Sequence, residues 1–246
     1  MTFLGFPRSA SIIVTGAASG IGRRIAHDAA RLGLGVSAWD VDEGGLAGLQ
    51  GEVSDAEGRV LPLCVDVDRP SEIAEALDRT AAELGPVGHL VNNAGPSSFG
   101  GLEFDDGLVR AVGSVRHVTA AWLQRPGSHD GSVVNISSVA GSITGGGATD
   151  WYAAAKAAIA GYTRFLALNR PNGVRANAVA PGFTRTPRTE AFLDSEAGVA
   201  ALARNPMQRA AGPEEISPAV LFLLSPAASY VNGALLPVDG GAVIVL

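Results

Sequence analysis

A tyrosine and a lysine stand four residues apart at Tyr152 and Lys156, in a stretch whose apolar spacing predicts a helix. Residues with that separation lie on one helix face, one turn apart. Of the 18 Lys and Arg residues in the chain, Lys156 is the single lysine. Arginine would serve a surface ion pair equally well, so an ammonium kept at this one position indicates a need for a compact point charge. We therefore expect Tyr152 and Lys156 to form an acid/base pair.

The charge of Lys156 could make Tyr152 a proton acceptor. A free tyrosine has a pKa near ~10, which must fall by roughly 2–3 units for the phenol to act as a base near neutrality. A positive charge about 5 Å away, at an effective dielectric constant of ~20, is worth roughly 3 kcal/mol. One lysine therefore nearly suffices to make Tyr152 a base.

Two adjacent serines, Ser137 and Ser138, follow the strand predicted over residues 131–136. Side chains alternate along a strand, so only one of the two can face the site. Its hydroxyl could hydrogen-bond the oxygen of an alcohol or of a ketone. A serine nucleophile is disfavoured, because the chain has no G-x-S-x-G turn and its four histidines form no nucleophile–base pattern.

A glycine-rich loop, TGAASGIG, places Gly16, Gly20 and Gly22 between the first predicted strand and the first predicted helix. Glycine permits a tight turn, lets backbone N–H groups approach a pyrophosphate, and is followed here by a positive helix N-terminus. Asp40 ends the second predicted strand, where a carboxylate accepts hydrogen bonds from ribose hydroxyls and repels a 2′-phosphate. Since loop residues 17–19 include no Arg or Lys, the sequence favours NAD over NADP.

Alternating strands and helices must position these residues. Short apolar and β-branched runs predict seven strands, over residues 11–15, 35–40, 59–65, 87–91, 131–136, 174–179 and 234–238. Apolar residues at helical spacing predict helices over residues 20–33, 70–84, 108–123, 151–168 and 213–224. Short buried strands separated by helices pair in parallel through right-handed crossovers. The prediction is an α/β fold, a single domain over residues 1–246 with a doubly wound seven-stranded parallel sheet and helices on both faces.

One segment, residues 187–212, follows the sixth predicted strand without a clear pattern. Ligands of open α/β sheets bind beyond the carboxyl ends of strands, so we expect a substrate lid here, with a plain surface loop as the alternative. The segments expected to shape the substrate pocket, residues 96–99, 142–149 and 187–212, are glycine-rich or apolar, which favours a neutral alcohol or ketone. The exceptions are nearby arginines whose directions the sequence does not define: Arg185, Arg188, Arg204 and Arg209.

Composition excludes several classes of partner. A net charge of −6 and a pI of about 5.2 argue against binding to nucleic acid or to an anionic membrane surface. No apolar run approaches the ~18 residues that would cross a bilayer, and we expect a cytoplasmic protein with no metal site. The one cysteine, Cys64, is expected to be buried in a strand.

Six motifs resemble, in order, those of the short-chain dehydrogenase/reductase family. They are TGAASGIG (15–22), VNNAG (91–95), NISS (135–138), YAAAK (152–156), NAVAPGFTRT (177–186) and VDGG (238–241). The resemblance implies a Rossmann-type fold and hydride transfer between NAD(P) and a hydroxyl or keto group. It further implies that Ser138 orients the substrate oxygen, Tyr152 exchanges a proton, and Lys156 holds the nicotinamide ribose and lowers the pKa of Tyr152.

The loop and the resemblance together give a set of cofactor-binding residues, for which NAD is the expected cofactor in preference to NADP. They are Gly16, Ser19, Gly20, Ile21, Gly22, Asp40, Val41, Asp66, Val67, Asn93, Ala94, Gly95, Tyr152, Lys156, Pro181, Gly182, Phe183, Thr184 and Thr186.

A departure from the family pattern keeps two alternatives open. The family usually has an asparagine in the helix after the fourth strand, whereas Gly113 or Ser114 occupies the corresponding place here. The main prediction is an NAD-dependent oxidoreductase that interconverts a secondary alcohol and a ketone, with Tyr152 as the acid/base. The alternatives are a catalytically weakened NAD-binding scaffold or sensor, and a reductase of a conjugated double bond, which the four-residue spacing of Tyr152 and Lys156 disfavours.

The composition and the carboxyl terminus also bear on assembly. Only 17% of the residues are charged, against ~25% in ordinary soluble domains. The chain ends in AVIVL, residues 242–246, although free termini are usually polar. This tail could pack on its own domain or against a neighbouring subunit. The resemblance to the family favours the second alternative and implies a homotetramer with dihedral symmetry.

Overall fold

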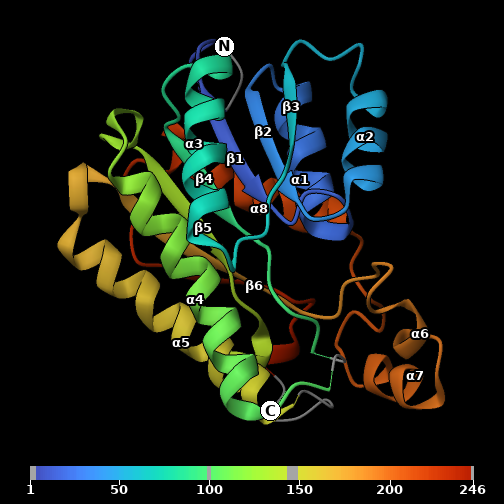
Figure 1. Cartoon of the computed structure of the whole chain (residues 1–246). Helices are drawn as coiled ribbons and strands as arrows, with labels where there is room; N and C mark the ends of the chain where they lie inside the picture. The colour runs from blue at the N-terminus through green and yellow to red at the C-terminus, as the bar shows by residue number, and fades with distance from the viewer. Residues whose placement is uncertain (1–3, 99–100, 143–148, 245–246) are drawn as a thin grey trace.

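A parallel sheet runs through the described part of the chain, residues 4–98, 101–142 and 149–244, in the computed structural model (Figure 1). Its strands lie in the order β3-β2-β1-β4-β5-β6-β7, and every neighbouring pair is parallel. The strands are β1 (Ser11–Thr15), β2 (Gly35–Asp40), β3 (Val60–Cys64), β4 (His89–Asn92), β5 (Ser132–Ile136), β6 (Arg175–Pro181) and β7 (Leu235–Val238). The predicted Rossmann-type sheet is thereby confirmed.

Helices cover both faces of this sheet. They are α1 (Gly20–Arg31), α2 (Glu43–Glu52), α3 (Pro70–Leu84), α4 (Phe104–Leu123), α5 (Asp150–Asn169), α6 (Glu190–Leu193), α7 (Glu196–Ala203) and α8 (Pro213–Leu224). In Figure 1, α3, α4 and α5 lie in front of the sheet, and α1 and α8 lie behind it. None of the helices in these described residues is both long and apolar enough to cross a bilayer.

Strand alternation builds one hydrophobic core on each face. Ile12 and Val14 of β1 enter the core beneath α1 and α8, whereas Ile13 enters the core beneath α3 and α4. Neighbouring side chains of a strand point to opposite faces, so a strand buried on both faces is apolar throughout. This explains why the short run SIIVT is sufficient to define the strand β1, all of whose residues are buried.

The chain order creates a switch point between two central strands. From β1 the chain moves outward through β2 and β3, then returns to place β4 on the other side of β1. The crossover connections leave the carboxyl ends of β1 and β4 in opposite directions, which opens a crevice there. The glycine loop follows β1 and residues 93–95 follow β4, so both predicted cofactor segments meet at this crevice.

Three local features differ from the sequence-based expectations. The helix α2 was not predicted, because its sequence EGGLAGLQGE is rich in glycine; Asp42 caps it by accepting a hydrogen bond from the Gly45 N–H at 3.0 Å. The segment 187–212 contains two short helices, α6 and α7. Cys64 is exposed, not buried, because it is the last residue of the edge strand β3.

Close packing of α4 on α5 fixes the helix that carries the predicted acid/base pair. Gly107 of α4 lies directly against the indole ring of Trp151, and a Cβ atom at Gly107 would overlap that ring. Trp151 is 1% exposed and forms an apolar cluster with Ala111 and Ala155. A larger residue at position 107 would therefore have to displace a buried ring.

The Gly107→Ala variant tests this packing. Overpacking of a filled core costs about 1–3 kcal/mol, which outweighs the ~1 kcal/mol that alanine gains over glycine in a helix. We expect urea unfolding to give a loss of about 1–2 kcal/mol in the free energy of unfolding. The control is Gly51→Ala in α2, where an added Cβ would contact nothing within 4 Å, and where we expect no loss. Equal stability of the two variants would contradict the proposed packing.

Candidate active site

A polar clamp joins the carboxyl ends of β1 and β4. The Thr15 hydroxyl donates to the Val91 carbonyl at 3.2 Å and accepts from the backbone N–H groups of Asn93 and Ala94, both at 3.0 Å. In return, the Asn93 side-chain amide donates to the carbonyl oxygens of Thr15 and Gly16, both at 3.0 Å. The two segments that follow these strands are therefore held in fixed relative positions.

The glycine loop bends tightly around this clamp. Gly16 and Gly20 have φ angles of +67° and +54°, in the left-handed region that favours glycine. Gly22 approaches so closely that a Cβ atom on it would overlap the Gly16 carbonyl oxygen and the Asn93 side chain. The glycines at positions 16 and 22 are thus required by the close approach of loop and clamp.

The loop delivers an open helix N-terminus to the crevice. Ser19 is the N-cap residue of α1, and its side chain makes no capping hydrogen bond. The first N–H groups of a helix lack intrahelical partners and carry partial positive charge, so they can bind a phosphate. The residues present therefore fit the diphosphate of a dinucleotide.

Asp40 lies at the end of β2, beside the same loop. One carboxylate oxygen accepts from the Ala18 N–H at 2.9 Å, and the other accepts from the Asp42 N–H at 3.1 Å. These contacts fix the carboxylate at the edge of the crevice, where Asp40 lines the candidate cavity. Its position suits hydrogen bonds to a ribose.

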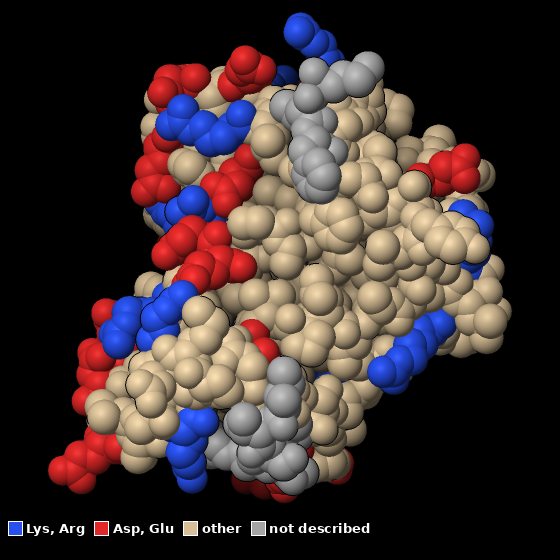
Figure 2. Space-filling model, turned by 180° about the vertical axis from the view of Figure 1, so that it is seen from behind, with Lys and Arg blue, Asp and Glu red and all other residues tan. Residues whose placement is uncertain are grey.

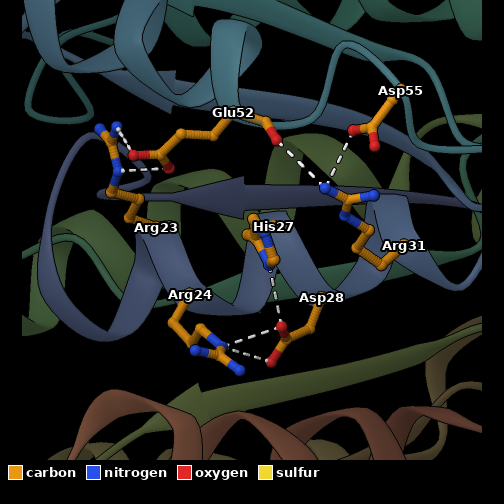
Figure 3. A network of polar contacts seen from close by, with 7 residues as sticks. All are labelled: Arg23, Arg24, His27, Asp28, Arg31, Glu52 and Asp55. Atoms are coloured by element: carbon orange, nitrogen blue, oxygen red, sulfur yellow. Dashed lines mark hydrogen bonds and ion pairs between the residues drawn. The ribbon is translucent and has the colours of Figure 1, made fainter.

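The arginines of α1 are engaged elsewhere (Figure 3). Arg23 pairs with Glu52 at 3.0 Å and donates to the carbonyl oxygens of Ala18 and Gly45 at 2.9 and 2.6 Å. Arg24 pairs with Asp28 at 2.8 Å. Because these guanidinium groups already have partners, they do not offer a free cation beside Asp40.

Tyr152, Lys156 and Ser138 lie together beyond the carboxyl end of β5. The Lys156 ammonium lies 5.5 Å from the centre of the Tyr152 ring and donates to the Ile136 carbonyl at 2.8 Å. Ser138 lines the same cavity as Tyr152, and its side chain acts to lower the Tyr152 pKa. Ser137 instead donates to the backbone carbonyl of Lys156 at 2.8 Å, which anchors α5 to the end of β5. Of the two serines, Ser138 therefore presents its hydroxyl to Tyr152.

Burial is the largest influence on the pKa of both Tyr152 and Lys156. It raises the pKa of Tyr152, against the opposing effects of the Ser138 hydrogen bond and of the Arg188 charge. Burial also lowers the pKa of Lys156 to about 8, with a further lowering by Arg188. The expected lowering of the Tyr152 pKa is thus not found in the protein alone, because the surrounding apolar atoms disfavour a phenolate. At neutral pH the pair consists mostly of a phenol and an ammonium.

A cavity of about 340 Å³ connects these groups with the glycine loop. The predicted residues that line it are Gly16, Ser19, Gly20, Ile21, Asp40, Asn93, Ala94, Ser138, Tyr152, Lys156, Pro181, Gly182, Phe183, Thr184 and Thr186. A wider hollow of about 530 Å³ adjoins the loop on the side of Arg23 and Arg24, but Tyr152 and Lys156 do not line it. The smaller cavity is therefore the candidate active site.

Five predicted cofactor residues do not line this cavity: Gly22, Val41, Asp66, Val67 and Gly95. Gly22 supports the loop from behind, and the Gly95 carbonyl accepts a hydrogen bond from Arg188 at 3.3 Å. The cavity also includes residues outside the predicted catalytic and cofactor sets, namely Ser98, Ile136, Ser137, Val139, Ala140, Arg188, Thr189, Phe192 and Ala242. Most are chain neighbours of predicted residues, whereas Arg188, Thr189 and Phe192 come from the predicted lid.

Apolar side chains of α4 face the catalytic part of α5. Ala111 packs with Trp151 and Ala155, and Leu108, Val112 and Tyr152 border this cluster. Ser114, one of the two positions matched to the asparagine of the family, is buried and donates to the Ala111 carbonyl at 3.2 Å. In the described part of the chain, no group of three or more His, Cys, Asp or Glu side chains is arranged to hold a metal ion.

Comparison with known proteins places these features in a family. A family model described as enoyl-(acyl carrier protein) reductase matches residues 16–243. A cis-4-hydroxycyclohexanecarboxylate dehydrogenase of Sinomonas cyclohexanicum is 39% identical over 245 residues, covering 93% of this chain and 94% of that protein. A 3-oxoacyl-[acyl-carrier-protein] reductase of Thermotoga maritima is 36% identical over 242 residues, covering 94% of this chain and 97% of that protein.

A solved structure shares the same architecture. A blue fluorescent protein from a metagenomic library, determined in complex with NADPH, has a TM-score of 0.84 and 30% identity, covering 94% of this chain and 97% of that one. These matches span the motifs from the glycine loop to VDGG in order. The chain therefore belongs to the short-chain dehydrogenase/reductase family of oxidoreductases.

Proposed function

We propose that the protein is an NAD-dependent dehydrogenase that interconverts a secondary alcohol and a ketone. The observation that carries this proposal is the meeting of Ser138, Tyr152 and Lys156 with the glycine loop in one cavity. When bound, the nicotinamide ring supplies or accepts the hydride. The open N-terminus of α1 and Asp40 would hold the diphosphate and adenosine ribose of that cofactor.

Tyr152 is the proposed proton donor and acceptor. The raised pKa keeps its phenol protonated near neutrality, which is the state that a ketone needs from its acid. Ser138, which lines the cavity with Tyr152, would orient the substrate oxygen between the two hydroxyl groups. Lys156 would hold the nicotinamide ribose, and its positive charge favours the phenolate that forms after proton donation.

Replacing Tyr152 tests its role. We expect Tyr152→Phe to lower kcat by at least ~10²-fold, because the proton donor is lost, while the Kd for NADH changes little. The measurements are turnover with a panel of secondary alcohols and ketones, and NADH binding by fluorescence. Near-native turnover would refute the assignment. NADH binding by the wild-type protein without turnover of any substrate would favour the scaffold or sensor alternative.

Replacing Lys156 distinguishes its two proposed roles. Lys156→Ala should weaken NADH binding and lower kcat, because one ammonium serves both ribose and tyrosine. Lys156→Arg should not restore turnover, since the wide guanidinium does not fit where the ammonium donates to the Ile136 carbonyl. Full rescue by arginine would show that charge alone suffices.

The preference for NAD is part of the proposal and rests on Asp40. Its carboxylate lines the cavity, while Arg23 and Arg24 are paired with acidic side chains. A carboxylate at this place repels a 2′-phosphate. The similar structure solved with NADPH shows that its own protein binds that cofactor, which makes the comparison of both cofactors essential.

The Asp40→Ala variant tests the cofactor preference. We expect the wild-type kcat/KM to be at least ~10-fold higher with NAD than with NADP, because one charge repulsion of ~1.4 kcal/mol corresponds to that factor. Asp40→Ala should lose most of this preference, chiefly by poorer use of NAD. Equal or better use of NADP by the wild-type protein would overturn the proposal.

A reductase of a conjugated double bond is the second candidate function. The description of the matched family model, an enoyl reductase, is the observation in its favour. The four-residue spacing between Tyr152 and Lys156 favours a carbonyl instead. A crotonyl thioester belongs in the substrate panel, and its reduction in preference to every ketone would favour this candidate.

We propose a homotetramer and a cytoplasmic location. Residues 216–238, which include most of α8 and all of β7, contain no Asp, Glu, Lys or Arg. Figure 2 shows a broad area without charged side chains on the side where α8 lies; most charged side chains of this view lie along the left margin, and a few lie on the right. The end of the predicted apolar tail, residues 245–246, lies outside the described residues.

A charge in this stretch tests the interface. Tyr230 is fully exposed, so Tyr230→Glu leaves the fold of one subunit intact but places a charge on the proposed interface. Native mass spectrometry should show tetramers for the wild-type chain and smaller species for this variant. The control is Val199→Glu, an exposed position on α7 outside the stretch. A monomeric wild-type chain would contradict the proposal.

A further inference from the structure

One arginine of the predicted lid faces the candidate active site without an acidic partner. Arg188 lines the cavity that contains Tyr152 and Lys156. Its neighbours in the sequence differ: Arg185 pairs with Asp194 at 2.9 Å, and Arg209 pairs with Glu215 at 2.7 Å. Among the described residues, no carboxylate forms an ion pair with Arg188, so its charge is uncompensated.

The contacts of Arg188 place its guanidinium across the crevice. Its Nη1 atom donates to the Gly95 carbonyl at 3.3 Å, and thus connects the lid segment with the loop after β4. A guanidinium has five N–H donors, so this bond leaves most of them available. Its charge acts on both Tyr152 and Lys156, lowering the pKa of each. Arg188 is therefore close to the reacting end of the cavity.

Apolar side chains border the same part of the cavity. Phe183, after β6, and Phe192, in α6, pack with ring centres 5.6 Å apart, and both line the cavity with Arg188. Ile136, Val139 and Ala140 line it as well. A ligand in this cavity meets these apolar side chains and the Arg188 guanidinium, with the Lys156 ammonium and several hydroxyl groups in the same lining. The acidic residue of the cavity, Asp40, follows β2 and already accepts two backbone hydrogen bonds.

We propose that Arg188 binds an anionic group of the substrate, and that the substrate is a hydroxy acid or oxo acid with its carboxylate on an apolar body. This inference rests on the proposed alcohol–ketone chemistry of the site. It replaces the neutral substrate expected from the sequence. A guanidinium binds a carboxylate through two parallel N–H···O bonds, so it fixes the orientation of the ligand as well as attracting it.

Paired substrates test this proposal. The acid is 4-hydroxycyclohexanecarboxylate, and its neutral counterpart is the corresponding carboxamide, which has nearly the same shape. We expect the wild-type kcat/KM to be at least ~10-fold higher for the acid, mainly through a lower KM. Arg188→Gln should abolish the preference for the acid over the amide. The readout is this ratio, because the variant also removes a charge that acts on Tyr152 and Lys156 and so changes the turnover of both substrates. The control is Arg204→Gln, which removes the same charge from an exposed position of the segment outside the cavity.

A binding experiment keeps the test independent of turnover. Calorimetry of the NADH-saturated protein should give tighter binding of cyclohexanecarboxylate than of cyclohexanecarboxamide, and Arg188→Gln should weaken only the acid, by at least ~10-fold. Equal binding of acid and amide would overturn the inference. The inference would also be overturned if Arg188→Gln lost affinity for NADH but still preferred the acid, because Arg188 would then bind the cofactor and not the substrate. If the protein binds the acid through Arg188 yet oxidises no alcohol, the proposed function fails and the anion site stands.

Discussion

The hydrogen bonds between Thr15 and Asn93 are the constraint on which the site depends. They tie together the ends of β1 and β4, which are neighbours in the sheet but lie far apart in the sequence. With the Asn93 amide held against the loop, only hydrogen fits at the Cα of Gly16 and Gly22, so the start of α1 is drawn toward the crevice. The same clamp holds the chain up to Gly95, whose carbonyl accepts the hydrogen bond from Arg188. The glycine loop proposed to bind the cofactor and the Arg188 contact of the segment 187–212 therefore depend on the same hydrogen bonds.

A second polar network fixes α5, which carries the proposed acid/base pair, against the sheet. The Asn92 side chain in β4 donates to Asn135 in β5 at 2.8 Å, and Asn135 donates to Thr163 in α5 at 2.9 Å. All three residues are buried, and each buried hydrogen bond that is kept avoids a desolvation cost of about 1–3 kcal/mol. Directional bonds of this kind select one register of α5 on β5. Apolar packing alone would define that register less strictly. The height of Tyr152 and Lys156 above the end of β5 follows from that register.

The sequence was sufficient for the features that depend on periodicity. Buried strands such as SIIVT and the spacing of Tyr152 and Lys156 follow from the geometry of one element, and six ordered motifs supported the topology. Features that depend on tertiary contacts could not be predicted from the sequence. The helix α2 was missed because its apolar pattern is weak, and Cys64 is exposed because β3 is an edge strand. The direction of Arg188 was equally hidden, since four arginines near the lid look alike in the sequence. Arg185 and Arg209 have acidic partners, and of the other two only Arg188 lines the cavity.

A substrate carboxylate bound at Arg188, as proposed above, would change the pKa values of Tyr152 and Lys156, the groups proposed to act at the reacting oxygen. Burial pushes Tyr152 toward the phenol and Lys156 toward the neutral amine, and the charge of Arg188 lowers the pKa of both. A carboxylate bound to Arg188 would compensate that charge, so both pKa values would rise. The phenol would then hold its proton more firmly, and the ammonium beside it would stay charged at a higher pH. A phenol with a higher pKa is also a weaker proton donor, so an acid group bound at Arg188 would change the acid strength of Tyr152 as well as the orientation of the substrate.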